Sequence, residues 1–61
     1  MNKSEAFKQR ILKKLDSVDI DFQIGYVYKR MIETEFKDIY WLNCYSFLKG
    51  LAHYMNIKTY R

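Results

Sequence analysis

Residues 39–55 read IYWLNCYSFLKGLAHYM, and this stretch decides what the chain folds into. Its apolar side chains recur every three or four residues, a spacing that places them on one face of an α-helix. They are Trp41, Cys44, Tyr45, Leu48, Leu51, Ala52 and Met55. Asp38 is suited to cap the start of this helix, and Asn56 is suited to end it. The pattern therefore predicts a helix over residues 39–55.

Three further aromatic residues broaden the apolar surface of this predicted helix beyond a single face. They are Tyr40, Phe47 and Tyr54. A helix with so wide an apolar arc either lies at the centre of its domain or contacts a partner.

Two more helices are predicted, near residues 4–17 and 21–36. In the first, the apolar residues with helical spacing are Phe7, Ile11, Leu12, Leu15 and Val18. Asn2 or Ser4 is suited to cap it. In the second helix, the corresponding residues are Ile24, Val27, Tyr28, Met31, Ile32, Phe36 and Ile39. Because no Pro and no Gly-rich linker interrupts the chain, we expect one all-α domain of three helices covering residues 1–61, as a monomer or a homodimer.

The junction between the first two helices has a second interpretation. Its apolar residues alternate with polar ones, which is the period of a half-buried β-strand. The alternating apolar residues are Val18, Ile20, Phe22 and Ile24. The sequence offers no comparable second strand, and an isolated strand is not stable. We therefore favour Asp19 or Asp21 as the cap of the second helix, with the strand as the alternative.

The composition excludes several classes of protein. The chain has 61 residues, with one Cys, one His and no Pro. One Cys and one His cannot supply the four ligands of a structural zinc site, and one Cys forms no intramolecular disulfide. No apolar run approaches the roughly 20 residues that span a bilayer, and the N-terminal MNKSEAFKQR lacks the apolar segment of a secretory signal. We expect a cytoplasmic protein without a metal, a cofactor or a membrane partner.

Three residues are candidates for catalysis or for a buried polar site. His53 falls on the polar side of its helix, without a carboxylate nearby to orient it. Cys44 lies inside the apolar stripe, where a thiol acts as a small core residue. Glu35 has the helical phase of the apolar face, where it needs a partner such as Lys8 or a tyrosine hydroxyl. If the helix instead ends near Thr34, Glu35 points to water. These residues form no catalytic group, so we do not expect an enzyme.

The charge balance suggests one class of partner. Eleven Lys and Arg against seven Asp and Glu give a net charge of +4 and a pI of about 9.3. A basic domain favours contact with phosphates. The basic residues that gather on the first two predicted helices include Arg10, Lys13, Lys14, Lys29 and Arg30. They predict, as the alternative function, a nucleic-acid-binding regulator.

The aromatic content suggests another class of partner. Six Tyr and one Trp exceed what the core of so small a domain needs, and these residue types anchor protein interfaces. Tyr26 lies off the apolar stripe of its helix. The aromatic residues expected to contact a partner are Tyr40, Phe47, Tyr54 and Tyr60. Our first functional hypothesis is a small regulator, either an inhibitor or an adaptor, that binds a partner protein through an aromatic-rich helical surface.

Overall fold

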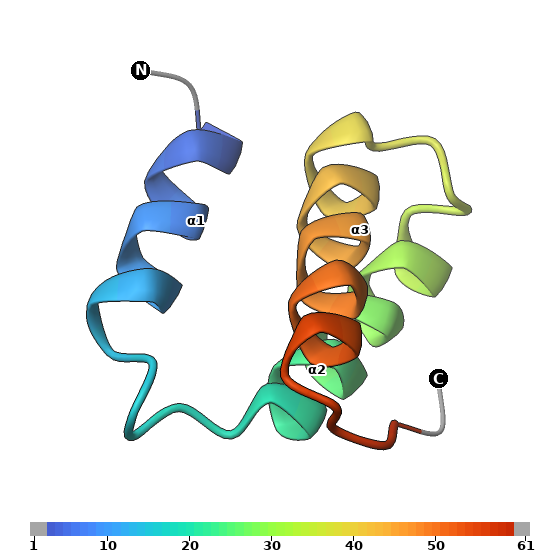
Figure 1. Ribbon diagram of the computed structural model, residues 1–61. Coiled ribbons are helices and arrows are strands. Elements are labelled where there is room, and N and C mark those ends of the chain that lie inside the picture. Colours follow the sequence, from blue (N-terminus) through green and yellow to red (C-terminus); the bar gives the residue numbers. More distant parts are fainter. Residues whose placement is uncertain (1–2, 60–61) are drawn as a thin grey trace.

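The computed structural model describes residues 3–59, which form three α-helices joined by short turns (Figure 1). Helix α1 spans Lys3–Lys13, α2 spans Ile20–Glu33 and α3 spans Ile39–Tyr54. This part of the chain contains no strand, so the predicted all-α class is confirmed. The alternative of a strand over residues 18–24 is wrong, because Ile20 already begins α2.

The helix ends follow from local side-chain hydrogen bonds. The Asp19 carboxylate accepts a bond from the Phe22 backbone N–H at 3.0 Å, so Asp19 rather than Asp21 caps α2. The Asp38 carboxylate accepts one from the Tyr40 N–H at 3.0 Å, which confirms the predicted cap of α3. Ser4 lies inside α1 rather than at its cap, and Asn2 lies outside the described residues.

Helix α1 ends four residues earlier than predicted. The Ser17 backbone N–H and its hydroxyl both donate to the Lys14 carbonyl, at 3.0 and 3.2 Å, and this closes a turn after Lys13. Ser and Asp side chains compete in this way with helical hydrogen bonds, and Asp16 also lies here. Leu15 and Val18 still pack against the core, but from the turn rather than from the helix. Their apolar spacing was therefore misleading.

Helix α3 is the central element of the fold. Both α1 and α2 pack on it, whereas the backbones of α1 and α2 make no contact with each other within residues 3–59. Figure 1 shows α1 on one side of α3 and α2 behind it. The buried apolar residues are Phe7, Ile11, Ile20, Ile24, Val27, Met31, Cys44, Leu48 and Ala52. Cys44 is fully buried, which confirms it as a core residue.

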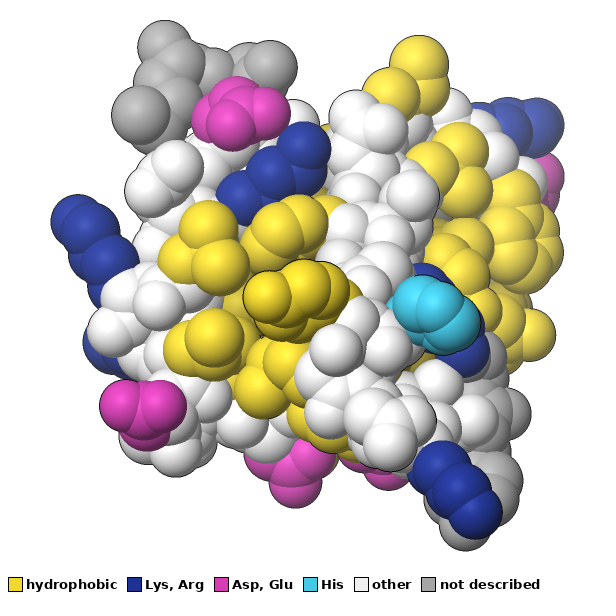
Figure 2. Space-filling view, in the orientation of Figure 1, with side chains coloured by type: hydrophobic (Ala, Val, Ile, Leu, Met, Phe, Trp, Pro, Cys, Tyr) yellow, Lys and Arg dark blue, Asp and Glu magenta, His cyan; other side chains and the backbone are white. Residues whose placement is uncertain are grey.

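The core is narrower than the apolar stripes of the sequence. Several stripe residues are more than a third exposed, namely Leu12, Ile32, Phe36, Ile39 and Met55. Leu12 and Ile32 are exposed because each outer helix packs on one neighbour and buries only a thin strip of its surface. The other three residues lie in the turn between α2 and α3 or at the ends of α3. In Figure 2, apolar side chains gather where α1 meets α3 and again over the α2 side of α3. Within residues 3–59, the fold thus leaves several large apolar side chains exposed.

Helix α2 ends in a strained turn. Glu35 and Phe36 have positive φ angles of 57° and 59°. Their N–H groups donate to Ile32 and Met31 carbonyls at 3.0 and 2.8 Å, the bond pattern of a Schellman motif. Because α2 stops at Glu33, the Glu35 side chain is exposed and pairs with Lys37 at 3.3 Å. A buried Glu35 paired with Lys8 or a tyrosine is therefore wrong.

Helix α3 also ends in a Schellman motif, and here the residue with positive φ is Asn56, which adopts this conformation more readily than Glu. Asn56 has a φ of 59°, and the following Ile57 N–H donates to the Ala52 carbonyl at 2.8 Å. Asn tolerates the left-handed conformation better than most residues, so the predicted stop is confirmed. The left-handed position of the motif is therefore Glu35 after α2 and Asn56 after α3.

We predict that Glu35→Gly stabilises the fold. Glycine removes a left-handed penalty of about 1 kcal/mol, which corresponds to a rise in Tm of about 4–8 °C in a domain of this size. The lost ion pair is highly exposed and contributes little. Thermal unfolding followed by circular dichroism measures the change. Asn56→Gly is the matched control and should raise Tm less; a lower Tm for Glu35→Gly than for the wild type would contradict this account.

Candidate functional site

The sequence-predicted aromatic residues of α3 lie along one flank of that helix. Tyr40, Phe47 and Tyr54 are each seven residues apart, so they follow one another down nearly the same line. Helix α1 reaches this flank, because Lys8 Nζ lies 5.9 Å from the centre of the Phe47 ring. Tyr40 and Phe47 are partly buried, whereas Tyr54 is 86% exposed. The fourth predicted residue, Tyr60, lies outside the described residues.

A second group of aromatic residues joins all three helices. The Arg30 guanidinium of α2 lies 5.3 Å from the centre of the Tyr26 ring. Tyr26 contacts Trp41 edge to face at 5.9 Å, and Trp41 contacts Tyr40 edge to face at 4.7 Å. Arg10 of α1 interacts electrostatically with the Tyr40 hydroxyl. We call these five residues the cation–aromatic array.

The array is held in place by local contacts on each helix. Arg30 follows Tyr26 by one turn, and its Nε donates to the Tyr26 hydroxyl at 3.3 Å. Tyr40 and Trp41 stand in the first turn of α3, which the Asp38 cap fixes. Edge-to-face contacts between rings are favourable because the positive ring edge meets the negative ring face. The array therefore combines residues of all three helices, and its central contacts are those between the Tyr26, Trp41 and Tyr40 rings.

The electrostatics of the array favour the charged form of Arg30 and the neutral form of the Tyr40 phenol. The hydrogen bond and charge interaction with Tyr26, and then Glu33, raise the pKa of Arg30. Burial raises the pKa of Tyr40, with a smaller contribution from Cys44, while Arg10 lowers it. At neutral pH the array thus presents two guanidinium groups at either end of three aromatic rings.

The array connects the two basic groups that the sequence indicated. Arg10 stands on α1 near Lys13 and Lys14, and Arg30 stands on α2 beside Lys29; all five are exposed. Lys13, Lys14 and Lys29 do not contribute to the array itself.

The sequence analysis missed the role of Trp41 in this site, because its spacing assigned it to the core stripe. The adjacency of Tyr40 to Trp41 and the one-turn spacing of Tyr26 and Arg30 were the available signals.

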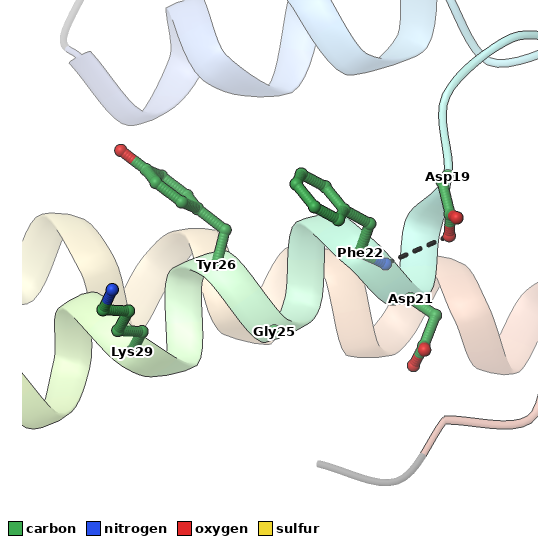
Figure 3. Close-up of a pocket in the computed structure, with 6 residues that line it drawn as sticks. All are labelled: Asp19, Asp21, Phe22, Gly25, Tyr26 and Lys29. Atoms are coloured by element: carbon green, nitrogen blue, oxygen red, sulfur yellow. Dashed lines mark hydrogen bonds between the residues drawn. The ribbon is translucent and has the colours of Figure 1, made fainter.

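The outer face of α2 carries a shallow pocket (Figure 3). It is lined by Asp19, Asp21, Phe22, Gly25, Tyr26 and Lys29. Figure 3 shows Phe22 and Tyr26 along one edge, Asp21 and Lys29 along the other, and Gly25 between them. Phe22 is 68% exposed, so the pocket has an open aromatic wall.

The candidate nucleophile, Cys44, and the candidate base, His53, lie on opposite sides of α3. Cys44 is buried, and burial raises the pKa of its thiol, although Tyr40, Lys8 and Arg10 lower it in part. His53 is exposed on the opposite side of α3. Within residues 3–59, no group of His, Cys, Asp or Glu side chains is arranged to hold a metal ion. None of the helices in this range has the length and hydropathy needed to cross a membrane.

No family model, curated protein or solved structure matches this chain. Its functional interpretation therefore depends on the geometry of its own residues.

We predict that Cys44 makes the stability of the fold fall at alkaline pH. Its pKa is raised in the folded state, so the folded protein keeps a proton that the unfolded chain releases above about pH 8.5. The free energy of unfolding is therefore unaffected by this group at lower pH and decreases as the pH rises above that value. Urea unfolding between pH 7 and 9.5 measures the slope.

The control is Cys44→Ala, which has no thiol proton to release. It should unfold at a lower urea concentration at pH 7 because a buried atom is lost, yet show a shallower decline above pH 8.5. Equal slopes for the two proteins would rule out the thiol as the cause.

Proposed function

We propose that this protein is a small non-enzymatic cytoplasmic regulator that acts by binding a partner protein, and that the cation–aromatic array is the centre of its binding surface. The observation that carries this proposal is the composition of the array. Tyr, Trp and Arg are the three residue types that dominate the energetic hot spots of protein interfaces. Here the three aromatic rings already pack against one another, so these side chains lose less conformational entropy on binding than isolated exposed side chains would.

The charge around the array favours an acidic partner surface. Arg10 and Arg30 stand at its two ends and are suited to pair with carboxylates in a bidentate manner. Residues 3–14 carry five Lys or Arg and one acid, which gives α1 a positive field. Such a field speeds association with an acidic partner. The α3 flank of Tyr40, Phe47 and Tyr54 extends the proposed surface, with Tyr54 as its most exposed aromatic residue.

Two features support binding rather than catalysis. The raised pKa of Cys44 keeps its buried thiol protonated, whereas a nucleophilic cysteine needs an open site and a lowered pKa. His53 lies on the far side of α3 and is exposed, so it does not act on that thiol. Catalysis by a nucleophile and base requires both groups within hydrogen-bonding reach.

Nucleic-acid binding is the second candidate, and one observation favours it. The array joins the basic groups of α1 and α2 through aromatic rings, and nucleic-acid sites often combine cations for phosphates with rings for bases. However, Glu33 pairs with Arg30 at 3.5 Å, and Asp38 stands beside Tyr40 at the start of α3. These acids repel a continuous polyanion more than they repel a protein surface, whose carboxylates are separated by neutral and basic residues. We therefore favour the protein partner.

We predict that Arg10→Ala combined with Arg30→Ala abolishes partner capture. The tagged protein should retain one stoichiometric protein from a lysate treated with nuclease. Removing two hot-spot residues weakens binding by about 100-fold or more. Lys37→Ala combined with Lys58→Ala removes the same charge from exposed positions elsewhere and should still capture the protein. Tyr54→Ala should weaken capture without changing the helical circular dichroism signal.

The nucleic-acid alternative gives different results in the same experiment. Capture would disappear with nuclease, fall steeply with salt, and be abolished by Lys13→Glu with Lys14→Glu. Equal capture by the Arg10/Arg30 variant and its charge-matched control would rule out the array as the binding surface.

A further inference from the structure

The outer face of α2 has the form of a hole in a helix–helix interface. Phe22, Gly25, Tyr26 and Lys29 occupy positions i, i+3, i+4 and i+7 on this face. In packed helix pairs, four residues with this spacing surround the side chain that a neighbouring helix inserts. Gly25 lies at the centre of this group (Figure 3), and because it has no side chain, another backbone can approach closely there.

This face lies away from the main contact between α2 and α3, and it carries two exposed aromatic side chains, of which Tyr26 also touches Trp41 at its edge. Helix α2 buries Ile20, Ile24, Val27 and Met31 on the side that faces α3. Phe22 lies on the opposite side and is 68% exposed, and Tyr26 beside it is 43% exposed. An exposed aromatic ridge next to a notch is typical of a surface that another helix covers.

The charges along this face identify which helix fits it. Asp19 and Asp21 stand at the start of α2, whereas Lys29 and Arg30 stand near its end. A parallel copy of α2 would place like charges together. An antiparallel copy, related by a twofold axis through Gly25, places Asp21 against the partner's Lys29. This pair then occurs twice, so the face is complementary to itself.

The aromatic residues fit the same arrangement. With Gly25 opposite the partner's Gly25, the ridge residues alternate along the axis in the order Phe22, the partner's Tyr26, Tyr26 and the partner's Phe22. Interdigitation of this kind fills the notch without steric conflict at its centre, because glycine faces glycine there. Charge order and side-chain size thus select the same register.

We propose that the protein forms a homodimer in which α2 packs antiparallel on α2 of a second copy around Gly25. The contact face is short, since 14 helical residues span about 21 Å. An interface of this length lies at the small end of specific interfaces, so we expect a dimer that dissociates on dilution. The dimer face includes Tyr26, which also belongs to the cation–aromatic array. The two proposals are nevertheless tested separately, because self-association is measured on the purified protein without any partner.

Sedimentation equilibrium from about 1 µM to 1 mM tests the proposal. The wild type should pass from monomer to dimer over this range. Gly25→Gln fills the notch and should weaken dimerisation at least tenfold, while the better helix propensity of Gln keeps the monomer folded. Circular dichroism confirms that the variant is helical. A wild type that stays monomeric throughout, or a dimer unaffected by Gly25→Gln, would overturn the proposal.

Charge exchange tests the antiparallel register. Lys29→Asp and Asp21→Lys each place like charges across the interface, so each variant alone should be monomeric at concentrations where the wild type dimerises. An equimolar mixture of the two should form a heterodimer, and the double variant should dimerise with itself. Lys37→Asp is the charge-matched control and should dimerise as the wild type does. Two single variants that fail to associate when mixed would contradict this register.

A different occupant of the notch gives its own result. If the wild type is monomeric and Gly25→Gln abolishes capture of a protein from lysate, the notch binds that protein instead of a second copy. This outcome would overturn the homodimer while leaving the proposed partner-binding function in place.

Discussion

The burial of Cys44 and Leu48 on α3 is the contact on which the rest of the structure depends. Neither side chain has exposed surface, and both lie on the helix that α1 and α2 share. Complete burial of a leucine side chain contributes about 2 kcal/mol, a large part of the net stability of a domain of this length. Because the core is thin, this line of residues on α3 sets the positions of both outer helices.

The cation–aromatic array is a consequence of that packing. Tyr26 reaches Trp41 because α2 lies against one side of α3, and Arg10 reaches Tyr40 because α1 lies against another. The array requires both of these interactions, so it depends on the packing of all three helices rather than on one helix alone. Side chains that neighbouring side chains hold by packing keep their geometry better than side chains on loops.

The sequence predicts the helices well where a cap and an apolar stripe agree. Asp38 and Asn56 bracket α3, and the structure starts and ends that helix within one residue of the expected bounds. The end of α1 is missed because Leu15 keeps helical spacing while Ser17 redirects the backbone into a turn. Apolar periodicity describes which side chains face the core, and a turn residue can satisfy it as well as a helical one.

Apolar periodicity does not predict the cation–aromatic array. Trp41 has the spacing of a core residue, and its position at an edge of the core depends on the angle at which α2 crosses α3. That angle arises from how side chains of both helices interlock, which a linear pattern does not contain. The basic residues could be counted from the sequence, but which of them meet an aromatic ring could not.

The absence of backbone contact between α1 and α2, within residues 3–59, has an energetic consequence. Substitutions on separate elements that share no neighbour combine additively, whereas those that touch a common side chain do not. In this fold, changes on α1 and α2 that touch no common side chain should add, whereas changes on α3 couple to both outer helices because both pack on it.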